Sequence, residues 1–259
     1  FITFTTTKFK KRLAKGLIAF LNFKKMKIKH ILLLIFAMFF SCSDDDSDEY
    51  QNIPIEFNVP SNFPALAYNL ETNPLTEKGF ELGKKLFYDG RLASDGVVSC
   101  GFCHIQEDAF THHGHTFSHG VGESIGTRNT PSIQNLAFQT TFMWDGATNH
   151  LDLQPIIPLT SPIEMDGNFE NIISMMKNDS SYKKLFKQAF SNGEISAENM
   201  LKALGQFMVM ATSSNSRFDK YRRNENGGTL STNELEGYAI FNQKRASCHA
   251  TDIFTDNSF

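Results

Sequence analysis

Apolar side chains recur with helical spacing in several segments of the chain. Spacing of three or four residues predicts amphipathic helices, each with one buried face. Such stripes occupy residues 76–88, 169–176, 182–190 and 200–211. A further helix is predicted after Ser231, which forms a capping-box pattern with Glu234. Sustained strand alternation is not found, so the sequence predicts a mostly α fold in which each stripe is ordinary core.

The periodicity fades between residues 89 and 165, where Gly, Asn, Thr and Pro are frequent. A loop of this length is unusual inside a compact domain. It becomes reasonable if a large cofactor replaces side chains as part of the core. The pattern therefore indicates a cofactor-binding segment.

The segment 26–42 is typical of a signal peptide. It has a basic start and an apolar run over residues 31–40, which is too short to span a bilayer. The run ends in Ser41-Cys42, which resembles a lipoprotein box; the alternative is simple cleavage near Ser41. Residues 1–25 are interpreted as upstream read-through and 43–60 as an acidic linker.

These features predict an exported protein of the periplasm or cell envelope. The lipoprotein-box interpretation further predicts an outer-membrane lipoprotein, attached to the membrane through lipid alone. The chain has 259 residues and a formal net charge of −3, which gives no reason to expect a nucleic-acid partner. Its length fits one large domain or two small ones, and its 25 Phe residues allow a substantial core.

The sequence Cys100-Gly-Phe-Cys103-His104 has the C-x-x-C-H spacing of c-type haem attachment. Two thiols add to the haem vinyl groups, and the following His offers an imidazole to the iron. The alternatives are a disulfide or a zinc site that would use two further ligands from His104, His112, His113 and His115. Because the chain has no second Cys pair to complete a four-Cys site, haem c is the preferred interpretation.

A second Cys-His pair, Cys248-His249, also follows a predicted helix, but Arg245 stands where the first Cys of the motif would be. Haem could be attached there through one thioether at Cys248, with His249 as a ligand, or it could be lost. We expect a second haem site in the lineage and leave its occupancy in this chain open.

Six stretches, taken in order, resemble the bacterial di-haem cytochrome c peroxidase family. They are LGKKLFYDGRLASDGVVSCGFCH (82–104), SHGVGESIGTRNTPSIQNLAF (118–138), FMWDGATNHLDLQ (142–154), PIEM (162–165), FDKY (218–221) and GYAIFNQKRASCHATDIFTDNSF (237–259). The resemblance implies two cytochrome c-like haem domains. It further implies reduction of hydrogen peroxide to water with electrons from a small cytochrome or copper protein, and often a homodimer.

The implied boundaries are 61–213 for a peroxidatic domain and 214–259 for the start of a second, truncated domain. A truncated second domain is expected to expose apolar faces near Leu235 and Phe241. By resemblance His104 is the proximal ligand of the peroxide-reducing haem, and His249 is the corresponding ligand of the second haem.

The resemblance also assigns roles in the segment after the first motif. His119 matches a distal ligand of the first haem iron, and His115 is its rival. Trp144 matches a tryptophan between the haems, and Asn129 matches a calcium ligand. The remaining His112 and His113 are expected to be solvated or to lie behind the ligands.

Gln154 and Glu164 match residues lining the peroxide pocket. Cleaving a bound peroxide requires a proton to move between its oxygens, which a carboxylate such as Glu164 can do. Arg128 could pair with a haem propionate or lie at the surface.

Three other functions are compatible with the sequence. They are a lipid-anchored, non-catalytic electron-transfer cytochrome, a related oxidase of aromatic side chains, and a zinc-binding module.

Overall fold

The computed structural model describes residues 49–51 and 53–256, which belong to a compact unit running from Asp48 to Phe259. The predicted leader and signal peptide, and the first part of the predicted linker, lie outside the described residues. Within the described residues the fold is helical, and its only β structure consists of isolated bridges. None of the helices described there has the length and apolar character needed to cross a membrane.

Each predicted helix is present. They are α3 (Glu77–Phe87), α6 (Phe169–Asn178), α7 (Ser180–Ala189), α8 (Ala197–Met210) and α10 (Thr232–Lys244). The predicted caps are also present: Thr76 accepts a hydrogen bond from the Gly79 amide, and Ser231 and Glu234 form a capping box. Such caps supply partners for amide groups that the first helical turn leaves unpaired.

The shorter helices were not predicted from periodicity. They are α4 (Cys100–Cys103), α5 (Ile156–Thr160) and α9 (Arg217–Arg222), together with the 3₁₀ turns η1 (Gly90–Leu92), η2 (Gln106–Asp108), η3 (Val121–Glu123), η4 (Leu136–Phe138) and η5 (Leu151–Leu153). Most of them lie in the segment 89–165, where they interrupt long loops.

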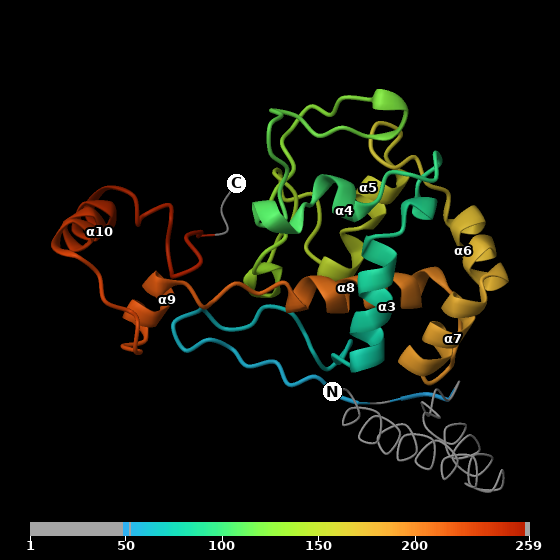
Figure 1. The fold of residues 1–259 in the computed structure, drawn as a ribbon, viewed down its shortest axis with the longest axis horizontal. Helices are drawn as coiled ribbons and strands as arrows, with labels where there is room; N and C mark the ends of the chain where they lie inside the picture. The colour runs from blue at the N-terminus through green and yellow to red at the C-terminus, as the bar shows by residue number, and fades with distance from the viewer. Residues whose placement is uncertain (1–48, 52, 257–259) are drawn as a thin grey trace, which may run out of the picture. The chain divides into compact units, whose positions relative to one another are not determined.

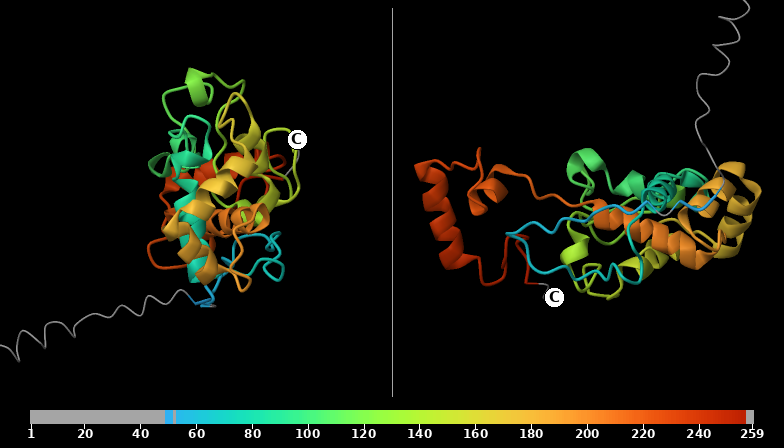
Figure 2. Two further views of the ribbon diagram at one scale, coloured as in Figure 1. Left: turned by 90° about the vertical axis from the view of Figure 1, so that its right-hand side faces the viewer. Right: turned by 90° about the horizontal axis from the view of Figure 1, so that it is seen from below.

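Helices α3 and α8 lie against each other at the centre of the core (Figures 1 and 2). Gly79 and Gly83 of α3 make the close approach possible. A Cβ on Gly83, for example, would lie 2.0 Å from the carbonyl oxygen of Ala203. Next to this crossing, the rings of Phe87 and Phe207 are 4.7 Å apart. Full burial of such a side chain stabilises the fold by about 1.5–3 kcal/mol.

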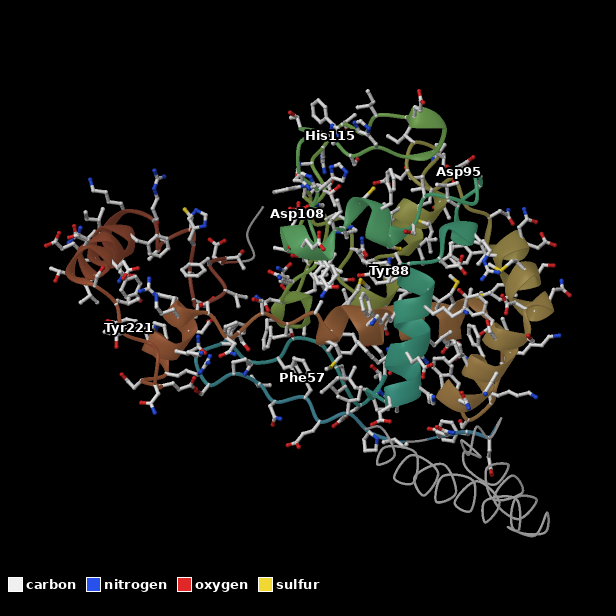
Figure 3. The ribbon with its side chains drawn as sticks, viewed as in Figure 1. Phe57, Tyr88, Asp95, Asp108, His115 and Tyr221 are labelled. Carbon is white, nitrogen blue, oxygen red and sulfur yellow. The ribbon has the colours of Figure 1, made fainter. Side chains whose placement is uncertain are left out.

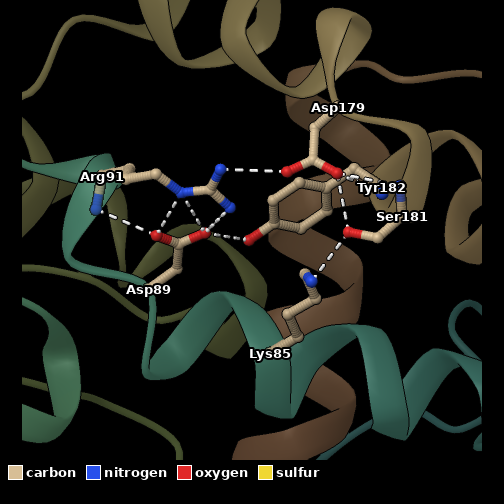
Figure 4. Close-up of polar contacts among 6 residues, drawn as sticks. All are labelled: Lys85, Asp89, Arg91, Asp179, Ser181 and Tyr182. Carbon is tan, nitrogen blue, oxygen red and sulfur yellow. Dashed lines mark hydrogen bonds and ion pairs between the residues drawn. The ribbon is translucent and has the colours of Figure 1, made fainter.

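A polar cluster joins the end of α3 to α7 (Figure 4). The hydroxyl of Tyr182, a fully buried residue, donates a hydrogen bond to Asp89 at 2.7 Å. Arg91 pairs with Asp89 and, at 2.9 Å, with Asp179. Each carboxylate therefore has a cationic partner, and this fixes the loop that leaves α3.

The C-terminal part of the described chain is held by polar contacts with the segment before α3. The side-chain amide of Asn62 donates to Asp219 and to Asp252 at 3.3 and 3.0 Å. No residue of α10 is buried. As predicted, Leu235 is exposed; Phe241 is only half-buried, because it packs against His249 and Phe254.

Candidate functional site

A cavity of about 440 Å³ lies within the segment that lacks helical periodicity. Helices α3 and α8 contribute Phe87, Leu204 and Met208 to its wall, and loops form the rest. Eight of the residues singled out in the sequence line it: Cys100, Cys103, His104, Arg128, Asn129, Trp144, Gln154 and Glu164. They come from four separate stretches of sequence, so the fold gathers them at one place.

His104 directly follows α4 and has one ring nitrogen already engaged. Its Nδ1 lies 2.9 Å from the carbonyl oxygen of Phe110 and donates to it, which leaves Nε2 as the bare nitrogen. The carbonyl is aimed by a tight turn in which Ala109 and Phe110 both have positive φ angles, 58° and 57°. Burial lowers the pKa of His104, so the neutral, ligand-competent imidazole is favoured.

The two thiols of the motif lie in the same wall. Burial raises the pKa of Cys100 to about 12 and that of Cys103 to about 11, and the negative charge of Glu164 adds to the second effect. The Cys103 thiol also donates to the carbonyl oxygen of His119 at 3.4 Å. Both groups are thus neutral thiols close to the ring of His104.

Gln154 and Glu164 approach the cavity from either side of α5. The amide of Gln154 donates to the sulfur of Met143 at 3.3 Å, which orients the side chain. Glu164 is half-buried, and its charge influences the Cys103 thiol, so the carboxylate lies near the attachment motif. An amide and a carboxylate beside the same small volume can orient a polar substrate and transfer a proton within it.

Trp144 and Asn129 form a connected edge of the cavity. The indole Nε1 of Trp144 donates to the carbonyl oxygen of Asn129 at 2.7 Å, while 56% of the Trp144 surface remains exposed. The Asn129 amide nitrogen donates to the carbonyls of His115 and Thr116. Arg128, also at this edge, pairs with Asp145 at 2.8 Å.

His119 is the predicted site residue of this segment that is not among the residues lining the cavity. Its ring lies 4.5 Å from that of His115, with His112 on the same loop nearby. Among the described residues that line the cavity, His104 is the one histidine, so the histidines of a mixed Cys-His zinc site are not gathered there.

Cys248 and His249 are both exposed and do not line this cavity. Their local geometry is nevertheless similar to that of the first motif. The His249 amide donates to the Arg245 carbonyl at 2.9 Å, and its Nδ1 lies 3.2 Å from the Phe254 carbonyl. The second pair therefore has the turn of a haem motif without an enclosing wall in the described residues.

Several residues that shape the cavity were not singled out in the sequence. Leu204 and Met208 are buried core residues, as the stripe predicted, and they also form part of the cavity wall. Thr130 is 5% exposed, lines the cavity, and its Oγ1 has no hydrogen-bond partner among the described residues. Met143 holds Gln154. No local pattern distinguishes such residues from core or loop positions.

The residues around the cavity fit a haem c group. Two neutral thiols stand beside an imidazole whose Nε2 is bare, and the wall is largely apolar. The hydroxyl of Thr130 gives this cavity-lining residue a polar atom that has no partner within the described part of the chain. This combination matches the covalent attachment and axial ligation that c-type haem requires.

Comparison with known proteins gives a family match over residues 77–227, to the model described as di-haem cytochrome c peroxidase. The chain is 33% identical to the methylamine utilization protein MauG of Methylorubrum extorquens over 220 residues, which are 84% of this chain and 61% of that protein. It is 31% identical to the cytochrome c peroxidase Ccp of Escherichia coli over 84% of this chain and 44% of the relative. The match thus spans 61% of the first relative's length and 44% of the second's.

Solved structures agree with the sequence comparison. A MauG-like protein associated with microbial copper homeostasis superposes with a TM-score of 0.70 at 31% identity, covering 79% of this chain and 62% of that one. The di-haem peroxidase BthA of Burkholderia thailandensis gives a TM-score of 0.58 at 19% identity, covering 77% and 57%, and supports the fold alone. The predicted fold class is confirmed.

Proposed function

Because the chain belongs to the di-haem cytochrome c peroxidase family, we propose that the complete protein reduces hydrogen peroxide to water. One peroxide, two electrons and two protons give two water molecules. The observation that carries the proposal is the convergence of Cys100, Cys103, His104, Gln154 and Glu164 on one cavity. The electrons would come from a small cytochrome or copper protein.

Cys100 and Cys103 would hold haem c through two thioether bonds, and His104 Nε2 would be a ligand of its iron. The hydrogen bond to the Phe110 carbonyl keeps the imidazole in one tautomer and one orientation. When bound, haem c supplies the redox-active iron at which peroxide is reduced. Thr130 and Arg128 are two of the polar residues in the wall that could contact the porphyrin.

Glu164 would take the proton from one peroxide oxygen and deliver it to the other, so that the departing oxygen leaves as water. Gln154, held by Met143, would hold the substrate in the orientation that this transfer needs. The apolar side chains from α3 and α8 would limit water in the cavity, which strengthens both polar interactions.

The remaining assignments follow the same resemblance. Residues 61–213 would form the peroxidatic domain and 214–259 part of the domain that carries the second haem, through Cys248 and His249. His119 would serve as the distal ligand of the resting first haem. The side-chain oxygen of Asn129 would serve calcium, because its amide nitrogen is used by the neighbouring loop. The protein would act in the periplasm or cell envelope, with lipid at Cys42 as its anchor.

Glu164→Gln in full-length, haem-loaded protein tests the proposal. Peroxide turnover with a reduced small cytochrome as donor should fall by roughly 10²–10⁴-fold, since general acid–base catalysis contributes about that much. Glu170→Gln, at an exposed position on α6, is the matched control and should leave turnover unchanged. Wild-type turnover in the Glu164 variant would refute the assigned role.

A second candidate, peroxide-driven oxidation of an aromatic side chain on a partner protein, is favoured by one observation. Trp144 lines the cavity and is also 56% exposed, so its ring joins the site to the protein surface. Trp144→Phe should leave the direct peroxidase reaction with a small donor largely intact if Trp144 serves only such a partner. If the variant loses turnover with a small donor as strongly as it loses oxidation of the partner, the result would argue for the peroxidase alone.

A further inference from the structure

The loop between α4 and η3 carries a group of histidines that the proposed peroxidase chemistry does not use together. The ring centres of His112 and His115 are 5.0 Å apart, those of His115 and His119 are 4.5 Å apart, and those of His112 and His119 are 6.4 Å apart. Figure 3 shows His115 on this loop. The loop brings three imidazoles together outside the cavity lining.

These spacings are those of ligands around one metal ion. A point equidistant from the three ring centres lies about 3.2 Å from each. A metal–nitrogen bond of about 2.0–2.1 Å places a metal at nearly that distance from the centre of the ring it binds. As the side chains stand, the described residues contain no ready-made metal group of three or more His, Cys, Asp or Glu. Turning each ring about its Cβ–Cγ bond redirects the nitrogens while the centres hardly move.

Two further observations support a ligand at this place. The Nδ1 atom of His112 is buried without a hydrogen-bond partner among the described residues, so a donor atom there is left unused. Gly114, within the loop, has a φ of 76° and open space where a side chain would be, which leaves room for adjustment. The neighbouring His113 is paired through Nδ1 with Asp108 and is not one of the three histidines considered as ligands.

The triangle of ring centres also indicates which metal. At the equidistant point, the directions to His112 and His115, and those to His115 and His119, form roughly right angles. His112 and His119 then lie on nearly opposite sides of the point. This arrangement fills three corners of a square plane, the geometry of Cu²⁺ and Ni²⁺ with nitrogen ligands, and Cu²⁺ binds more tightly in the general order of divalent metals. We propose that His112, His115 and His119 form a Cu²⁺ site. In the copper-bound protein His119 is therefore not available as the distal ligand of the first haem, so the two roles of His119 exclude each other.

The test is a titration of full-length, haem-loaded protein with copper sulfate, followed by calorimetry and by electron paramagnetic resonance with the haem-only spectrum subtracted. One Cu²⁺ per chain should bind, with a tetragonal signal split by nitrogen. Loss of a supporting group near a metal costs about 10–100-fold in affinity, so His115→Ala, which removes a ligand, should cost at least about 100-fold. His150→Ala, an exposed histidine outside the loop, should change nothing.

Because His115 is exposed, its variant should keep the fold of the wild type. A haem spectrum identical to that of the wild type is the check. His112→Ala provides the second test, with the same expected loss. Copper binding at wild-type affinity in both variants, or a copper signal without nitrogen splitting, would overturn the proposal. Because the readout is copper itself, failure of the peroxidase assignment would not affect it.

Discussion

The first Cys-His segment and the second share their local backbone and differ in their surroundings. In each, the His amide bonds to the carbonyl four residues earlier, at 2.8 Å for His104 and 2.9 Å for His249. In each, the His Nδ1 lies beside a Phe carbonyl a few residues later. Each His ring is also 6.3 Å from a Phe near the end of a long helix, Phe87 of α3 or Phe241 of α10.

The difference lies in packing. Helix α3 buries Leu82, Leu86 and Phe87 against the core, whereas no residue of α10 is buried. The first segment opens onto a cavity with an apolar wall, while Cys248 and His249 are exposed. The comparison teaches that a short turn is enough to orient the histidine. Enclosing a cofactor requires packing from segments distant in sequence.

The largest effect is expected in the count of covalent haems. Cys100→Ser with Cys103→Ser should remove haem from the first site, whereas Cys248→Ser should remove at most a single-thioether haem from the second. Arg245→Cys should raise attachment at the second site by restoring the second thiol. Intact-protein mass and a haem stain after denaturation measure each change. An Arg245 variant that carries no more haem mass on its polypeptide than the wild type would show that enclosure, and not the missing thiol, limits the second site.

A smaller effect is expected from matched glycines, Gly83 in α3 and Gly237 in α10, each four residues before a Phe. A Cβ on Gly83 would clash with the Ala203 backbone, so Gly83→Ala should destabilise the protein by about 1–3 kcal/mol. Nothing lies within 4 Å of a Cβ on Gly237, so Gly237→Ala should be neutral or stabilise by about 0.5–1 kcal/mol. Urea unfolding monitored by circular dichroism measures both, and equal effects would contradict the difference in packing.

The smallest effect concerns acid. Burial raises the pKa of Asp89, but hydrogen bonds from Arg91 and Tyr182 outweigh it and hold that pKa below its usual value. A lowered carboxyl pKa stabilises the fold above the unfolded-state value of about 3.9, and this contribution is lost as pH falls through the folded-state pKa. Tyr182→Phe should therefore cost about 1–3 kcal/mol at pH 7 and less in acid.

Urea unfolding at pH 7 and pH 3 measures this difference. Tyr221→Phe is the control in the C-terminal region, because its hydroxyl makes no hydrogen bond within the described part of the chain. A Tyr182 variant whose deficit is the same at both pH values would show that packing, and not the Asp89 carboxylate, is responsible.

Sequence periodicity and capping identified the long helices because these depend on local spacing and on single residues such as Thr76 and Ser231. The short α9 was missed, although its Ser216–Asp219 capping box is visible in the sequence, because six residues carry too little periodicity. The positive φ angles of Ala109 and Phe110 could not be predicted, since neither residue type favours that conformation.

The candidate site shows the same division. The attachment motif and, through resemblance, Gln154 and Glu164 were found from sequence, and the structure places them around one cavity. Met143 and Thr130 were not found, because their roles depend on contacts between loops that are separate in sequence. The position of His119 beside other histidines likewise depends on how the loop folds back.

The backbone next to His119 is joined to that of Glu164. The Val121 amide donates to the Glu164 carbonyl at 2.8 Å, and Gly120 is packed so tightly that a Cβ would lie 2.2 Å from the Ile163 carbonyl oxygen. The backbone segments that carry His119 and Glu164 are therefore directly connected. A movement of the histidine loop, such as the proposed binding of a metal ion would cause, would therefore also displace the backbone of Glu164, the proposed proton-transfer group.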